Sequence, residues 1–117
     1  MSDIHETLEL WGAWAASDNS NVDFSPIAAG FKGLLPQTSR ARPQCSDDDG
    51  IMIDGCVARL KKYNPEEYKL IILHFVCRVS LRKIAKAQKC SDGKIRRDLQ
   101  TAIGFINGLV CYLSEVK

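Results

Sequence analysis

Apolar residues recur every three or four positions along most of this chain, a spacing typical of amphipathic helices. A first helix is predicted over residues 2–16, and polar residues 17–21 interrupt the pattern after it. Ser25-Pro26 then provides an N-cap and a proline at the first helical position of a short helix that ends near residue 33. No segment alternates with period two, so the pattern predicts an all-α protein.

A third helix is predicted to begin after Ser46. The run Asp47-Asp48-Asp49 follows this residue, and carboxylates in a first turn complement the positive end of the helix dipole. The helix is expected to end near Lys62. Its buried face is expected to contain Ile51 or Met52, Cys56 or Val57, and Leu60.

The next helix start is equally distinct. Asn64, Pro65 and Glu67 combine a cap, a helix-starting proline and the carboxylate of a capping box. Residues 68–77 are apolar almost all round, so they predict a buried central helix. A final long helix is predicted from the cap Ser91 almost to the end of the chain.

Residues 80–99 have the pattern of a helix-turn-helix. Ser80 and Ser91 cap its two helices, and the inward-facing residues are predicted to be Ile84, Ala85, Ile95 and Leu99. Lys89 occupies the turn position often taken by glycine, where a left-handed backbone costs about 1 kcal/mol. The predicted fold is therefore a compact multi-helix domain over residues 1–117, with a helix-turn-helix followed by a long C-terminal helix.

Positive charge is concentrated on this same segment. Residues 78–97 carry eight lysines and arginines against one aspartate, a net charge of +7, whereas residues 1–77 carry a net charge of −4. A focused basic face beside a helix-turn-helix is the footprint of a DNA-binding protein. The alternative is a solvated basic helix packed on a helical core.

The predicted DNA contacts fall into two groups. The second helix of the motif enters a major groove with its N-terminal end, and its expected base contacts are Asp92, Lys94, Arg96 and Arg97. The preceding helix, the caps and the turn are expected to bind phosphates through Ser80, Arg82, Lys83, Lys86, Lys89 and Ser91.

No catalytic, metal or cofactor chemistry is predicted, because the chain has no Gly-rich phosphate loop and no recognisable catalytic spacing. The five cysteines include no C-x-x-C pair, and neither His5 nor His74 has metal-ligand spacing, so free thiols and no zinc are expected. The aspartates at 47–49 lack the spacing of a calcium loop. Trp11 and Trp14 are assigned to the core.

The longest aliphatic run, residues 70–73, is far shorter than a membrane span, and no secretory signal is recognisable. We therefore expect a soluble cytoplasmic protein. Two features stay open. Gly104 and Gly108 suit either close approach of another helix or second protomer, or a weak turn. Arg40 and Arg42 lie in a predicted exposed loop and either contact nucleic acid or polymerase or are simply solvated.

Several long segments of the sequence resemble the late antitermination protein Q family of lambdoid bacteriophages. They are WGAWAASDNS at 11–20, SPIAAGFKGLLP at 25–36, CSDDDG at 45–50, VARLKK at 57–62 and SDGKIRR at 91–97. Residues 65–113 also resemble, more loosely, the domain of bacterial sigma factors that reads the promoter −35 element. Some members of the wider group carry a cysteine-rich zinc insert, which this sequence lacks, so it resembles the zinc-free branch.

The resemblance implies a phage-encoded regulator without enzymatic activity in the cytoplasm of the bacterial host. Such a protein binds double-stranded DNA at the late promoter and engages the paused host RNA polymerase holoenzyme, including its sigma factor. The polymerase then reads through pauses and terminators; steric blocking of RNA hairpins at the exit channel is a hypothesis for how. A second protomer on the DNA is left open. The alternative function is a sigma-like or repressor-like regulator that acts on initiation only.

Overall fold

The computed structural model describes residues 3–20, 24–31, 33 and 42–115, and every regular element among them is helical. The elements are α1 (Ile4–Trp14), the π-helical η1 (Ala15–Asn19), α2 (Ser25–Gly30), α3 (Asp47–Tyr63), α4 (Pro65–Ile71), the π-helical η3 (Ile72–Val76), α5 (Leu81–Ala87) and α6 (Asp92–Glu115). The prediction of an all-α fold with a long C-terminal helix is confirmed.

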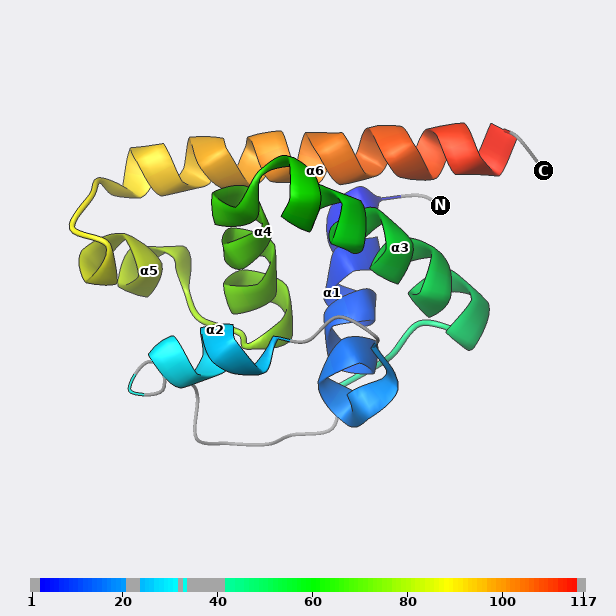
Figure 1. Cartoon of the computed structure of the whole chain (residues 1–117), viewed down its shortest axis with the longest axis horizontal. Coiled ribbons are helices and arrows are strands. Elements are labelled where there is room, and N and C mark those ends of the chain that lie inside the picture. Colours follow the sequence, from blue (N-terminus) through cyan, green and yellow to red (C-terminus); the bar gives the residue numbers. More distant parts are fainter. Residues whose placement is uncertain (1–2, 21–23, 32, 34–41, 116–117) are drawn as a thin grey trace.

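The long helix α6 lies along one side of the molecule and covers the other helices (Figure 1). It packs on α3, α4 and α5 and also reaches α1. The helix α5 lies at the end of the molecule where α6 begins, and α2 lies on the side away from α6 (Figure 1). This arrangement places the turn between α5 and α6 at one tip of the molecule.

The centre of the fold is the continuous helix formed by α4 and η3. Asn64 caps it by accepting a hydrogen bond from the Glu67 backbone N–H at 3.2 Å, and the Asn64 amide donates to the Glu67 carboxylate at 3.0 Å. Almost every apolar residue of this helix is buried: Tyr68, Leu70, Ile71, Ile72, Leu73, Phe75 and Val76. The predicted cap and the predicted buried helix are both confirmed.

The two tryptophans are core residues, as predicted, and the indole N–H of each donates to an aspartate of α3. Trp11 is fully buried and donates from Nε1 to Oδ1 of Asp54 at 3.2 Å. Trp14 donates from Nε1 to Oδ1 of Asp47 at 2.9 Å. Because buried indole N–H groups need an acceptor, these two bonds fix α1 against α3.

Two glycines permit the close approach of α1 to its neighbours. A Cβ atom on Gly12 would overlap the carbonyl group of Phe75 in η3. A Cβ atom on Gly50, in the first turn of α3, would overlap the indole ring of Trp14. Any larger residue at either position must therefore displace a helix backbone or a buried ring.

The predicted polar break after the first helix is wrong. The helix continues as η1 to Asn19, and side chains of η1 bond to carbonyls one turn earlier: Asn19 donates to Trp14 O at 2.9 Å and Ser17 donates to Ala13 O at 3.2 Å. The predicted start of the next helix is also shifted. Phe24, and not Ser25, is the N-cap of α2.

The buried face of α3 agrees with the prediction at Met52, which is half-buried against the core, and extends beyond it at Ile53 and Asp54. Ile51 is 64% exposed, whereas Ile53 and Asp54 are buried. Asp54 faces inward and accepts a hydrogen bond from the buried Trp11 N–H. Cys56, Val57 and Leu60 are buried as expected, and His74 is half-buried.

The last helix stays regular through Gly104 and Gly108, both of which are exposed with open space around them. Its buried residues are Ile95, Leu99, Ala102, Ile103, Ile106 and Val110, and Leu109 and Leu113 are half-buried. Of the predicted exposed loop that contains Arg40 and Arg42, residues 36–41 lie outside the described residues.

Candidate nucleic-acid interface

The helices α5 and α6 are each started by a serine. The Ser80 hydroxyl accepts a hydrogen bond from the Lys83 backbone N–H at 3.2 Å, and the Ser91 hydroxyl accepts one from the Lys94 backbone N–H at 3.1 Å. Each bond satisfies one of the N–H groups that a helix start leaves without an intrahelical partner. Both predicted caps are confirmed.

The turn between these helices depends on Lys89. Its φ angle is 55°, a left-handed conformation at the turn position often taken by glycine. Two backbone bonds close the end of α5 in the manner of a Schellman motif: Lys89 N–H to Lys86 O at 3.2 Å and Cys90 N–H to Ala85 O at 3.0 Å. A non-glycine residue pays about 1 kcal/mol or more for this conformation, so the turn is held by the packing on either side of it.

Apolar packing fixes how the two helices meet. Ile84 and Ala85 of α5 are buried, and so are Ile95 and Leu99 of α6. Cys90, at the end of the turn, is half-buried against the same core cluster. The inward face of the motif is therefore the predicted one.

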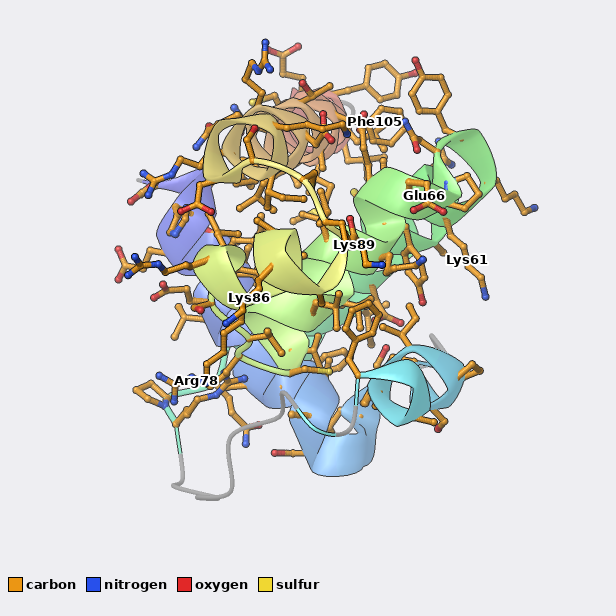
Figure 2. The ribbon with its side chains drawn as sticks, turned by 90° about the vertical axis from the view of Figure 1, so that its left-hand side faces the viewer. Lys61, Glu66, Arg78, Lys86, Lys89 and Phe105 are labelled. Carbon is orange, nitrogen blue, oxygen red and sulfur yellow. The ribbon has the colours of Figure 1, made fainter. Side chains whose placement is uncertain are left out.

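All ten residues predicted to contact DNA are exposed: Ser80, Arg82, Lys83, Lys86, Lys89, Ser91, Asp92, Lys94, Arg96 and Arg97. Arg78, Lys86 and Lys89 lie at the same end of the molecule, which faces the viewer in Figure 2. Among the residues that the structure describes, Lys94 is the one cation of segment 78–97 with a carboxylate within 4 Å. The charge of this end is therefore largely uncompensated.

The exposed side of α6 has an internal order. Arg97 lies one turn after Gly93 and Lys94 on the outermost face, whereas Arg96 lies one turn after Asp92 on a flank. Gln100, exposed and one turn after Arg96 and Arg97, continues this surface. Sequence reasoning missed Gln100, although its spacing from the two arginines was visible.

Lys94 has a partner that was not anticipated. Its ammonium group donates to Oδ2 of Asp98, one turn later, at 2.7 Å. The hydrogen bond to Asp98 and the charge of that carboxylate raise the pKa of Lys94. On the adjoining α4, burial and the Asp98 charge raise the pKa of the Glu67 carboxyl. The carboxylates of Glu67 and Asp98 thus form an acidic edge beside the basic face of α5 and α6.

No metal site can be assembled from the described residues, which contain no group of three or more His, Cys, Asp or Glu suited to hold an ion. The five cysteines are free thiols, and burial raises the pKa of Cys45, Cys56 and Cys77. Within the described part of the chain, no helix combines the length and apolar character needed to cross a membrane.

Solved structures with this fold exist. The transcription antitermination factor Q21, in a structure described as a complex with Q21-binding-element DNA, gives a TM-score of 0.69 at 19% identity, covering 97% of this chain and 93% of that one. A crystal structure of the bacteriophage 21 Q protein gives 0.67 at 22% identity, covering 97% and 94%. These matches establish the class of fold, an all-α domain that carries an exposed basic helix-turn-helix.

The particular family follows from the sequence comparison. The family model for phage antitermination protein Q matches residues 1–117, and the chain belongs to this family. It is 49% identical over 113 residues to the probable antitermination protein Q of Acyrthosiphon pisum secondary endosymbiont phage 1, covering 96% of this chain and 76% of that protein. It is 46% identical over 113 residues to the prophage antitermination protein Q homolog QuuD of Escherichia coli (strain K12), covering 97% and 89%. The predicted family resemblance is confirmed.

Proposed function

We propose that this protein acts as an antitermination factor from a DNA site at a phage late promoter, which its helix-turn-helix binds. The observation that carries the proposal is the uncompensated charge of segment 78–97 on a correctly capped and packed α5–α6 unit. A merely solvated basic helix has no need of a strained left-handed turn at Lys89. The proposal of DNA binding is supported by Q21, a protein of the same fold whose structure is described as a complex with Q21-binding-element DNA.

Within this proposal the N-terminal end of α6 reads bases. Arg97 and Arg96 each donate in a bidentate fashion to guanine, Lys94 donates less rigidly, and the Asp92 carboxylate accepts from a cytosine amine. The outermost placement of Arg97 makes it the main determinant. Asp98 holds Lys94 along the helix, so that Lys94 must exchange this partner for a base.

The phosphate contacts come from the rest of the motif. Arg82, Lys83, Lys86 and Lys89 are exposed cations without a carboxylate partner among the described residues. The hydroxyls of Ser80 and Ser91 accept from the backbone and still carry a proton to donate to a phosphate oxygen. Such contacts set position and register, whereas sequence preference comes from α6.

The second half of the function is engagement of the host RNA polymerase holoenzyme, including its sigma factor, in the bacterial cytoplasm. The acidic character of residues 1–77 suits basic protein surfaces and is repelled by DNA. The protein carries out no chemistry of its own. It acts by changing how polymerase responds to pauses and terminators, with steric blocking of RNA hairpins as the mechanism, and a second protomer can occupy adjacent DNA.

The experiment is in vitro transcription from a phage late promoter through a downstream terminator, with and without the protein. Readthrough confined to the promoter that carries the binding element is expected. A matched template with that element scrambled serves as the control. A change in initiation alone, without readthrough, would favour the alternative of a sigma-like or repressor-like regulator.

A further inference from the structure

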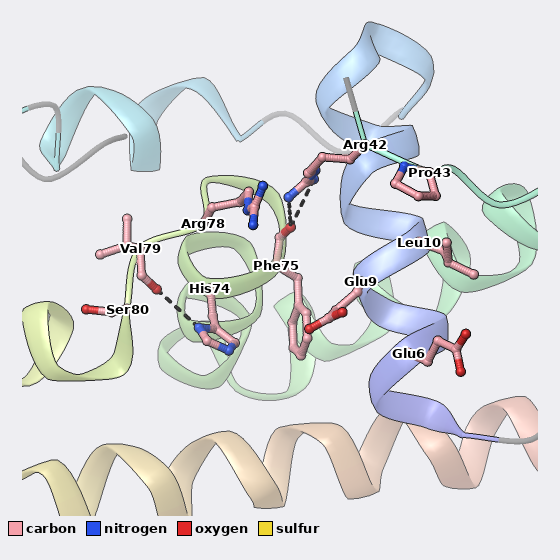
Figure 3. A pocket seen from close by; sticks show the side chains of 10 residues that line it. All are labelled: Glu6, Glu9, Leu10, Arg42, Pro43, His74, Phe75, Arg78, Val79 and Ser80. Atoms are coloured by element: carbon pink, nitrogen blue, oxygen red, sulfur yellow. Dashed lines mark hydrogen bonds between the residues drawn. The ribbon is translucent and has the colours of Figure 1, made fainter. Parts of the chain in front are cut away.

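A cavity of about 680 Å³ lies beside the helix-turn-helix, outside the residues predicted to contact DNA apart from Ser80. Its walls come from α1, from η3 with the turn that follows it, and from the segment that precedes α3 (Figure 3). Arg42 and Arg78 occupy one side of it, and Glu6 and Glu9 line the α1 side. The cavity therefore brings together charged residues that are far apart in the sequence.

Arg42 is held in place by backbone. Its Nη1 and Nη2 atoms both donate to the Phe75 carbonyl oxygen in η3, at 3.3 Å each (Figure 3). Burial, and then the nearby charge of Arg78, lower the pKa of Arg42. The guanidinium is thus partly desolvated beside a second cation.

Arg78 reaches this position through a costly backbone conformation. Its φ angle is 61°, left-handed like that of Lys89. Among the described residues, no carboxylate lies within 4 Å of Arg42 or Arg78. Two like charges, one of them partly desolvated, are brought together with no carboxylate in direct contact, and the Glu9 charge acts on Arg42 only from beyond 4 Å. A bound oxyanion would offset both their repulsion and the backbone cost.

The position of the pair favours DNA as the source of that oxyanion. Ser80, the cap of α5, lines the same cavity, and Arg78 lies at the molecular end that carries Lys86 and Lys89 (Figure 2). The pair therefore continues the basic face beyond the motif. Glu6 and Glu9 would repel further phosphates of a DNA backbone that extended along the cavity toward α1. The site therefore suits a single phosphate.

We propose that Arg42 and Arg78 form a clamp for one DNA backbone phosphate outside the helix-turn-helix contacts. This inference rests on the proposed function, because it adds a contact to the same DNA. Arginine suits the role because its planar guanidinium binds phosphate in a bidentate fashion. The clamp contributes affinity and register, and no sequence preference.

The test is the dissociation constant for late-promoter duplex and for scrambled duplex, measured over a range of salt. The variants are Arg78→Gly, which keeps the left-handed backbone accessible, and Arg42→Gln combined with Arg78→Gly. The double variant should bind both duplexes about tenfold more weakly at low salt. The slope of log K against log salt should fall by about 0.9, the value for one phosphate. Conversely, Glu9→Gln should bind both duplexes about twofold more tightly.

The matched control is Arg59→Gln with Lys62→Gln, which also removes two cations, both exposed on α3 and outside the cavity. Circular dichroism checks that each variant is folded. An equal change in slope for the control would mean that net charge alone is responsible, and an unchanged slope for the clamp variants would overturn the proposal. Lost terminator readthrough with intact DNA affinity would instead assign the cavity to a protein or RNA partner. Absence of salt-dependent DNA binding by the unmodified protein would overturn the proposed function itself.

Discussion

The two ends of this molecule use charge in opposite ways. Where α1 meets α3, acidic groups accept hydrogen bonds from core side chains: buried Asp54 accepts from buried Trp11, and exposed Asp47 accepts from buried Trp14. At the α5–α6 end, one ion pair, Lys94 with Asp98, compensates one of eight cations among the described residues. Charged groups that are bonded within the fold contribute to stability, whereas charged groups without an internal partner are available to bind another molecule.

The comparison predicts that substitutions at the two ends separate cleanly. Changes where α1 packs against α3 and η3 should alter stability and leave the binding of folded protein intact, whereas changes at the α5–α6 end should alter DNA binding with little effect on stability. A substitution that changed both properties together would break this division.

The largest effect is expected at Gly12. Because an added methyl group meets the Phe75 backbone, Gly12→Ala should lower the free energy of unfolding by about 3 kcal/mol. Gly104→Ala is the matched control on an open helix face and should be neutral or stabilising by up to about 1 kcal/mol. Urea unfolding measures both. Equal effects of the two substitutions would mean that α1 does not approach η3 as described.

Arg97→Ala is expected to have the next largest effect. Loss of a bidentate base contact should weaken binding to promoter DNA by about 2 kcal/mol and relax the preference at one base pair. Competition binding with a set of single-base variants of the site measures this. If scrambled DNA weakens equally, Arg97 binds phosphate and the orientation of α6 in the groove is wrong.

Removing two cations from α5 should weaken binding without changing preference. Arg82→Ala with Lys86→Ala should reduce affinity for all duplexes alike and lower the salt slope by about two units. Both residues are exposed, so the melting temperature should stay the same. A constant slope would place α5 away from the DNA backbone.

Asp98→Asn tests the opposite change at the α5–α6 end, because it removes the carboxylate partner of a cation. Releasing Lys94 and removing a negative charge should raise affinity for scrambled duplex by about twofold while promoter binding gains less, so discrimination falls. Glu115→Gln, exposed at the far end of α6, is the control. Improved discrimination by the Asp98 variant would contradict the restraint assigned to this carboxylate.

The smallest effect is expected from chelators and reducing agents. With five free thiols and no group of metal ligands among the described residues, EDTA and dithiothreitol should leave the melting temperature and DNA affinity unchanged. A collapse of the melting temperature in EDTA would require a structural metal.

Sequence predicted the features that depend on neighbouring residues. The caps at Ser46, Asn64, Ser80 and Ser91 follow from residues three positions apart, and each is present. Its place in the turn between α5 and the long α6 likewise marked Lys89 as the position where a left-handed backbone is common, and its φ angle is left-handed. Local chemistry determines these features, so a single sequence suffices to find them.

The features that were missed depend on contacts between distant segments. Asp54 turns inward because Trp11, 43 positions away, needs an acceptor, and no local pattern signals that need. Likewise, Arg42 reaches the Phe75 carbonyl across 33 positions and so meets Arg78. The inward placement of Asp54 on α3 and the set of residues that line the cavity could therefore be identified only from the folded structure.

The most direct test of the account is the salt dependence of DNA binding by the unmodified protein, measured on late-promoter and scrambled duplexes. The exposed cations Arg82, Lys83, Lys86 and Lys89 predict a slope of log K against log salt of about −4 or steeper on both. The base contacts of α6 predict tighter binding to the promoter duplex at every salt concentration. A slope near zero, or equal affinity for the two duplexes, would contradict the assignment of the uncompensated end to DNA.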